Sequence, residues 1–189
     1  MTTTASAIDA PPVSANPLTD DDWSRELTTR SGYAFRVRPA DAGDEAGLAG
    51  FFTHVTPEDL RFRFLSAIKT VGHDQIARMT HVDHRGTENF LAFDTQHGTM
   101  VATGMLAADA TLETAEVAIA IHKDFKHRGI GWTLLEHITA YARSRGIRTI
   151  ESLESRDNHQ AIELEREMGF ELVPSAGDPS SVIVRHSLR

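Results

Sequence analysis

The sequence predicts an α/β domain in which helices pack on the faces of a mixed sheet. Runs typical of strands occur at residues 33–38, 89–94, 99–109 and 116–121. Apolar residues at helical spacing recur at residues 129–145 and 158–168, and further strand-like runs follow each of these stretches. Paired strands followed by alternating strands and helices make a mixed sheet with helices on its faces.

The N-terminal part of the chain divides into an arm and the start of a domain. Residues 1–17 are small, polar and proline-bearing, so we expect a flexible arm ahead of a single domain at residues 18–189. Thr19 or Asp20 is expected to lead a helical turn before the first strand. Residues 33–38 form that strand, which Pro39 closes.

Short helices are expected between the first strand and the next. Asp41 caps a helix that runs to about residue 54, and Thr56 caps a second helix at residues 57–66. Glu58 and Asp59 complement the dipole of the second helix. A third short helix covers residues 73–79.

The C-terminal half alternates strands and helices. A TQHG turn joins the strands at 89–94 and 99–109 into a hairpin. Gly169 ends the helix at 158–168 in the position of a C-terminal cap. The remaining strands are expected at residues 148–155, 170–174 and 181–187.

Composition excludes several classes of function. A formal net charge of −8 argues against general nucleic-acid binding, which depends on Lys and Arg. The absence of cysteine excludes disulfides and thiolate catalysis and is compatible with the cytoplasm. The chain has no apolar run that could span a bilayer and no secretory signal pattern. We therefore expect a cytoplasmic protein without a membrane partner.

A basic loop with two glycines, HKDFKHRGIG, precedes the helix at 129–145. The first amides of a helix lack intrahelical partners, and Gly129 and Gly131 let a ligand approach the backbone. Lys126, His127 and Arg128 add charge, so the loop suits phosphates. A tight strand-to-helix connection would need the same glycines. A dinucleotide-binding turn is disfavoured, because "HKDFKHR" separates the preceding strand from the first glycine and a third glycine is missing.

Two motifs resemble those of a known family. KHRGIG resembles the acetyl-CoA-binding signature of the GNAT family of N-acetyltransferases, Q/R-x-x-G-x-G/A, with Lys126 in place of Gln or Arg. DNHQAIELEREMGF, at residues 157–170, is similar to the family's N-x-x-A-x-x-L-(Y)-x-x-x-G-F segment. The resemblance implies a mixed, mostly antiparallel sheet, splayed between its fourth and fifth strands, with helices on both faces.

The resemblance also implies acetyl-CoA as co-substrate and no metal. Pantetheine would pair with strand backbone in the splay, and the phosphates would lie on the glycine loop. Asn158 would hydrogen-bond the pantetheine or cap its own helix. The implied cofactor-binding residues are Ile119, Ala120, Ile121, Lys126, His127, Arg128, Gly129, Ile130, Gly131, Trp132 and Asn158.

Three longer segments resemble the catalytic domain of bacterial Pat-type protein lysine acetyltransferases: TPEDLRFRFLS, MTHVDHRGTENFLAF and TAEVAIAIHKDFKHRGIG. This implies direct transfer of an acetyl group to a protein lysine in a ternary complex, and members of the family are often homodimers. A small amine or an N-terminus as the acceptor stays open. So does a non-catalytic acyl-CoA-binding module.

Acetyl transfer needs a base, because a lysine amine with a pKa near ~10.4 is mostly protonated at neutral pH. Glu116 opens the strand ahead of the segment expected to hold pantetheine, and in the Pat-type resemblance the glutamate of AEVAI is the catalytic base. Glu113, in the preceding turn, is the weaker alternative. Glu116 as a solvated strand-end residue is the other interpretation.

The proton donor to the departing thiolate is open between two candidates. Many relatives place a tyrosine after the leucine of the A-x-x-L-Y segment, where this chain has Glu165. Either Glu165 donates the proton with a raised pKa, or water does. Water is favoured, because a helix glutamate is expected to be exposed.

Other charged residues give weaker signals. His81 and His84, with Asp83 between them, lack a strong zinc spacing, so we expect solvated histidines and no metal site. Arg61 and Arg63 could shape an acceptor site, but a solvated helix face is favoured.

Overall fold

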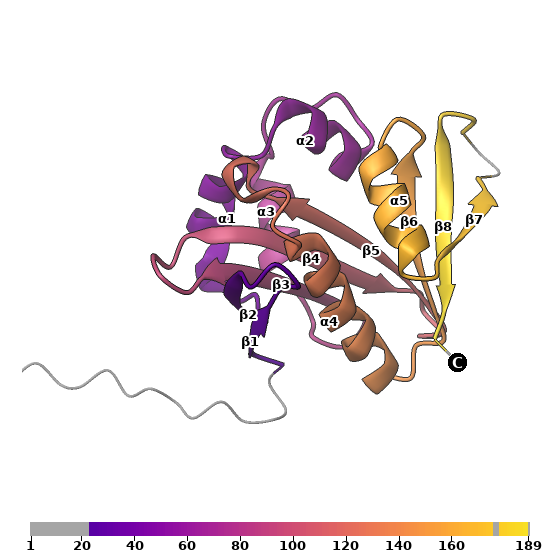
Figure 1. The fold of residues 1–189 in the computed structure, drawn as a ribbon, viewed down its shortest axis with the longest axis horizontal. Helices are drawn as coiled ribbons and strands as arrows, with labels where there is room; N and C mark the ends of the chain where they lie inside the picture. The colour runs from indigo at the N-terminus through magenta and orange to yellow at the C-terminus, as the bar shows by residue number, and fades with distance from the viewer. Residues whose placement is uncertain (1–22, 176–177, 189) are drawn as a thin grey trace, which may run out of the picture.

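A computed structural model describes residues 23–175 and 178–188 of the chain. These residues form one sheet of eight strands in the order β1-β2-β3-β4-β5-β6-β8-β7 (Figure 1). The strands are β1 (Arg25–Thr28), β2 (Ala34–Pro39), β3 (Thr87–Asp94), β4 (Met100–Ala108), β5 (Thr114–Ile121), β6 (Thr149–Ser155), β7 (Glu171–Pro174) and β8 (Ser181–Ser187). The expected arm at residues 1–17 lies outside the described residues.

The sheet opens between β5 and β6. All neighbouring strands are antiparallel except this pair, which is parallel. The pair is in register from Thr114 opposite Thr149 to Glu116 opposite Glu151, and beyond that point the two strands diverge (Figure 1). The prediction of a mixed, mostly antiparallel sheet splayed between its fourth and fifth strands is confirmed. The two strands are fifth and sixth here, because an additional strand precedes them.

The additional strand, β1, was not predicted from the sequence. Residues Arg25–Thr28 pair antiparallel with β2, so this strand is held by its cross-strand partner. The turn closes where Thr29 N donates to Tyr33 O at 2.9 Å. Gly32 has φ +86° in this turn, a conformation that favours glycine. Thr19 and Asp20 lie outside the described residues.

The helices begin where the caps were predicted. They are α1 (Glu45–Phe52), α2 (Pro57–Phe64), α3 (His73–Thr80), α4 (Ile130–Ser144) and α5 (His159–Glu167). Asp41 Oδ1 accepts from Gly43 N at 2.7 Å, in a 3-10 turn that leads into α1. Thr56 Oγ1 accepts from Asp59 N at 3.1 Å at the start of α2. Gly169, with φ +89°, follows α5 as predicted.

Helices cover both faces of the sheet and hold β5 in place (Figure 1). α4 packs on one face, where Leu134 and Ile138 are fully buried. Gly104 on β4 permits this approach, since a Cβ there would lie 2.6 Å from Ile138 Cδ1. α1 and α3 cover the other face through residues such as Phe51 and Ile76. Each such side chain stabilises the fold by about 1.5–3 kcal/mol when fully buried, so β5 is anchored from both sides.

Candidate functional site

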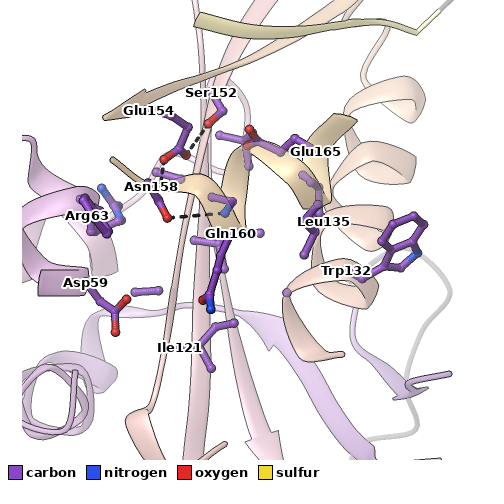
Figure 2. Close-up of a pocket in the computed structure, with 18 of the residues that line it drawn as sticks. Asp59, Arg63, Ile121, Trp132, Leu135, Ser152, Glu154, Asn158, Gln160 and Glu165 are labelled. Atoms are coloured by element: carbon purple, nitrogen blue, oxygen red, sulfur yellow. Dashed lines mark hydrogen bonds between the residues drawn. The ribbon is translucent and has the colours of Figure 1, made fainter. Parts of the chain in front are cut away.

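The splay between β5 and β6 holds a cavity of about 780 Å³ (Figure 2). Its walls come from α2, from β5 with the loop after it, from the start of α4, and from β6 with α5. The divergence of two strands in one sheet leaves backbone on each inner edge without a cross-strand partner. A cavity bounded by such edges can receive an extended, hydrogen-bonding ligand.

Nearly all the residues predicted to form the site line this cavity. These are Glu116, Ile119, Ala120, Ile121, Lys126, His127, Gly129, Ile130, Gly131, Trp132 and Asn158. Arg128 is the exception. Its guanidinium lies over the rings of Tyr33 and Phe125, 5.2 and 4.8 Å from their centres, and does not line the cavity.

The two glycines fit tightly at the start of α4. Gly129 has φ +82°, and a Cβ there would lie 3.2 Å from Thr29 Cβ in the β1–β2 turn. A Cβ on Gly131 would lie 3.3 Å from Ile121 Cδ1 on β5. No side chain in the described part of the chain caps this helix, so its first amides keep their donors for a ligand. Such a helix start suits an anion.

Cationic groups surround this helix start. Lys126 Nζ lies 2.9 Å from each carboxylate oxygen of Asp59 on α2, which ties the loop to that helix. Arg30, from the β1–β2 turn, lies 4.0 Å from the ring centre of Trp132, and both residues line the cavity. Sequence reasoning missed Arg30, because β1 and the turn that joins it to β2 were not predicted.

Glu116 is an exposed residue on β5 that lines the cavity. Strand alternation puts it on the same side of the sheet as Ala120, which packs in the core beneath α1 and α3. Glu113, the weaker alternative, forms an ion pair with Arg148 at 2.9 Å and is not among the cavity-lining residues. The geometry therefore favours Glu116 over Glu113 as a group that can meet a ligand.

Two carboxyl groups with raised pKa values, Glu154 and Glu165, lie on the β6–α5 side of the cavity. Glu154 accepts from Ser152 Oγ at 2.6 Å and from Asn158 Nδ2 at 2.7 Å, and burial raises its pKa (Figure 2). Glu165 is buried; burial first, and the charge of Glu154 second, raise its pKa to about 8. The expectation that Glu165 is exposed is wrong, because α5 turns this residue towards β6.

Asn158 joins this cluster to the start of α5. Its side chain is the predicted cap: Oδ1 accepts from Ala161 N at 3.5 Å, a long bond. The amide nitrogen of the same side chain donates to Glu154. The cap is confirmed, and contact with pantetheine stays a prediction.

Arg63 on α2 also reaches the cavity, contrary to the expectation of a solvated helix face. Burial lowers its pKa, while the charges of Glu116 and Glu154 act in the opposite direction. Its Nη2 lies 3.9 Å from the sulfur atoms of both Met79 and Met105. The alternation of charge and phenylalanine in RFRF does not reveal this burial, which depends on where α2 meets the splay.

The histidines considered for a metal site have other partners. His81 Nε2 lies 2.6 Å from Glu45, and His84 Nδ1 lies 3.1 Å from Glu88. Within residues 23–175 and 178–188, no group of three or more His, Asp or Glu residues could hold a metal ion. No helix in the same ranges is long and apolar enough to cross a membrane.

Solved structures resemble this fold over most of the chain. The GNAT domain of a PAT protein from S. lividans matches with a TM-score of 0.81 and 26% identity, over 90% of this chain and 99% of that one. A cAMP-binding acyltransferase from Mycobacterium smegmatis matches with a TM-score of 0.60 and 18% identity, over 88% of this chain and 47% of that one. A spermidine N-acetyltransferase from Vibrio cholerae, solved with CoA and spermine, matches with a TM-score of 0.63 and 16% identity, over 80% of this chain and 92% of that one.

Sequence comparison agrees with the structural likeness. An uncharacterized N-acetyltransferase from Methanocaldococcus jannaschii is 37% identical over 76 residues, which cover 36% of this chain and 34% of that protein. The match thus spans about a third of that relative. The family model described as "Acetyltransferase (GNAT) family" matches residues 48–170, from α1 through the end of α5. The chain therefore belongs to the GNAT family of acetyltransferases.

Proposed function

We propose that this protein transfers an acetyl group from acetyl-CoA directly to an amine, and that the amine is the side chain of a protein lysine. The observation that carries the proposal is a cavity in the splay that is lined both by the start of α4, which has no side-chain cap among the described residues, and by Glu116. Membership of the GNAT family supports acetyl-CoA as the donor.

The residues present fit acetyl-CoA as co-substrate. The β5 backbone at Ile119, Ala120 and Ile121 borders the splay and offers hydrogen bonds to the amides of pantetheine. The amides of the first turn of α4 take the pyrophosphate. The side chains of Lys126 and Arg128 add positive charge nearby, and Lys126 can bind phosphate when it leaves Asp59. His127 lines the cavity beside Lys126. The proposal keeps the other binding residues predicted from the sequence, which also line the cavity: Gly129, Ile130, Gly131, Trp132 and Asn158.

Glu116 is the proposed general base. It takes a proton from the incoming ammonium, directly or through one water, so that the neutral amine attacks the thioester carbonyl. Its exposure supports this role, since an exposed carboxylate in the cavity wall can be reached by the incoming amine. The amine nitrogen gains the acetyl group, and the carbon–sulfur bond breaks.

The lysine acceptor is supported by the likeness to the GNAT domain of the S. lividans PAT protein. Small amines and peptide N-termini are the alternative acceptors, and a non-catalytic acyl-CoA-binding module is the alternative role. A homodimer and a cytoplasmic location belong to the same proposal; the absence of cysteine fits a reducing compartment.

Thiol release from acetyl-CoA tests the proposal with three acceptor sets: folded proteins and lysine peptides, polyamines, and peptides with free N-termini and no lysine. We expect release with the first set. Mass spectrometry of a lysate treated with labelled acetyl-CoA then identifies the modified lysines. Release with another set alone would reassign the acceptor. Binding of acetyl-CoA without release in any set would favour the non-catalytic module.

A further inference from the structure

Glu165 is a carboxyl group buried in the wall of the cavity. The residue is 5% exposed and lines the cavity from α5. Its Oε2 is buried and has no hydrogen-bond partner among the described residues. Leaving a buried polar atom unpaired is costly, so such an atom in a cavity wall is a candidate for contact with a ligand.

The surroundings of Glu165 favour the neutral acid. The ionisable group that acts on it is Glu154 on β6, whose negative charge opposes a second one. Arg63 on α2 acts on Glu154 rather than on Glu165. On α4, Leu135 lines the same cavity. On β8, His186 Nδ1 lies 3.1 Å from Gly169 O, and His186 does not line the cavity.

The two carboxyl groups differ in their hydrogen-bond partners. Glu154 accepts from Ser152 and Asn158, and such donors stabilise an ionised carboxylate. The donor that acts on Glu165 is Ser152, which Glu165 shares with Glu154, and Glu165 Oε2 has no hydrogen-bond partner among the described residues. Where two neighbouring carboxyl groups have such different environments, one holds the proton and the other the charge. Here Glu165 holds the proton.

We propose that Glu165 donates its proton to the sulfur of coenzyme A as the thiolate departs, and that Glu154 is a positioning residue that keeps Glu165 protonated. This inference rests on the proposed function. The carbon–sulfur bond breaks, the sulfur takes the proton of the Glu165 carboxyl, and Glu165 regains a proton from solvent after the thiol leaves. The acceptor ammonium loses two protons: Glu116 takes the first before the attack, and the second passes to solvent as the amide forms. With both counted, protons and charge balance.

The chemistry of donor and acceptor is well matched. An alkyl thiol has a pKa of ~8.5, close to that of Glu165, and proton transfer between groups of similar pKa is efficient. Water is a much weaker acid. The enclosed position of Glu165 therefore reverses the preference for water that an exposed glutamate supported.

The test compares Glu165→Gln with wild type, using Glu136→Gln as the matched control. Glu136 is exposed on α4 and does not line the cavity. The amide keeps the shape of the neutral acid without its proton. We expect kcat to fall about 100-fold for Glu165→Gln, with the KM for acetyl-CoA within about threefold of wild type. The control should match wild type.

The pH profile separates a proton donor from a structural role. In wild type, kcat should fall as the pH rises through about 8, because the donor ionises. The Glu165→Gln variant should lose this alkaline limb, and Glu154→Gln should move it to lower pH. A structural role would lower activity equally at every pH.

Infrared spectroscopy measures the protonation state of the Glu165 carboxyl group without any turnover. The spectrum of wild type minus Glu165→Gln should contain the carbonyl band of a protonated carboxyl group at pH 7, and the band should vanish near pH 9.5. An ionised Glu165 at pH 7, or an unchanged kcat profile in the Gln variant, would overturn this inference and leave the proposed function intact. A wild type that binds acetyl-CoA but acetylates nothing would overturn both.

Discussion

Two buried glutamates lie in different parts of the fold, one on β3 and one on α5, and their surroundings differ in kind. Glu88, on β3, is 2% exposed, and Glu165 is 5% exposed. Both oxygens of Glu88 lie 3.1 Å from His84 Nδ1, and Oε1 also accepts from Asn89 N at 3.0 Å. Glu165 instead lies in a cavity wall and has one buried oxygen without a partner among the described residues.

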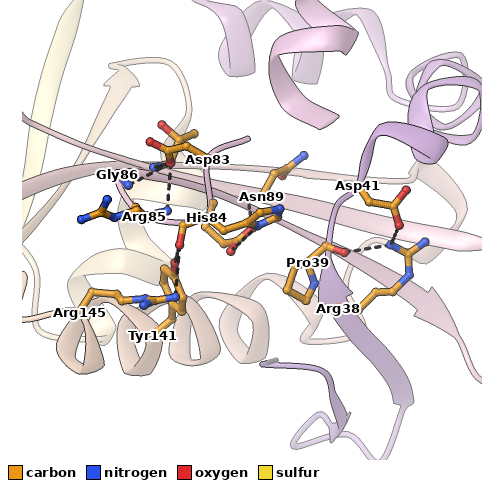
Figure 3. Close-up of polar contacts among 12 residues, drawn as sticks. Arg38, Pro39, Asp41, Asp83, His84, Arg85, Gly86, Asn89, Tyr141 and Arg145 are labelled. Atoms are coloured by element: carbon orange, nitrogen blue, oxygen red, sulfur yellow. Dashed lines mark hydrogen bonds and ion pairs between the residues drawn. The ribbon is translucent and has the colours of Figure 1, made fainter. Parts of the chain in front are cut away.

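Polar groups in the loop around His84 also have hydrogen-bond partners. Asp83 Oδ1 accepts from the amides of Arg85, Gly86 and Thr87. The carbonyl of His84 accepts from Tyr141 and Arg145 of α4, which ties the loop to that helix (Figure 3). Burial raises the pKa of both Glu88 and Glu165, so burial alone does not distinguish structure from function. An unpaired polar atom in a residue that lines a cavity does distinguish them.

Removing the base should give the largest effect and should spare the fold. For Glu116→Gln we expect kcat to fall by about 100- to 1,000-fold, because the ammonium loses its proton acceptor. Acetyl-CoA affinity and melting temperature should stay near wild type, since Glu116 is exposed. Thiol-release kinetics, calorimetry and thermal denaturation measure the three quantities. Glu113→Gln, outside the cavity, is the control. Full activity in Glu116→Gln across the pH range would refute its role.

At Glu88 we expect the opposite pattern: lower stability with nearly normal activity. Glu88→Ala removes a buried acceptor that His84 and Asn89 share, and should lower the free energy of unfolding by about 1–3 kcal/mol. The kcat and KM should stay within about twofold of wild type, because this cluster does not line the cavity. Urea denaturation and steady-state kinetics measure the two effects. A large loss of kcat with normal stability would show that the comparison between the clusters is wrong.

A smaller effect is expected from a methyl group at Gly129. In Gly129→Ala the positive φ is strained and Cβ approaches Thr29, so the start of α4 must shift. We expect a loss of stability of about 1–2 kcal/mol and acetyl-CoA binding weakened by about tenfold. Gly98→Ala is the matched control: φ is +67° and nothing lies within 4 Å of its Cβ. It should cost similar stability but leave the dissociation constant unchanged in calorimetry.

Sequence patterns predicted most of the fold because helix caps and apolar periodicity depend on residues close together in the chain. Asp41 and Thr56 mark helix starts, and the apolar periodicity of α4 marks its buried face. The β1 strand was missed, because its stability comes from pairing with β2 rather than from its own sequence.

The site was predicted in part for the same reason. The glycine loop and Glu116 belong to short motifs, KHRGIG and AEVAI, that can be recognised in the sequence. The burial of Arg63 and Glu165 depends on how α2 and α5 approach the splay, and no local pattern reports that. Helical spacing does place Glu165 one turn after Ala161, which also lines the cavity, and this was a usable signal.

Hydrogen–deuterium exchange with and without acetyl-CoA tests the central claim most directly, namely that the cofactor lies in the splay. Amides that face the opening have no cross-strand partner and should exchange quickly without ligand. We predict that acetyl-CoA slows exchange at residues 117–121 of β5 and 129–133 of the α4 start, and leaves residues 83–89 unchanged. Unchanged exchange at the first two segments, or protection concentrated at residues 83–89, would contradict the account.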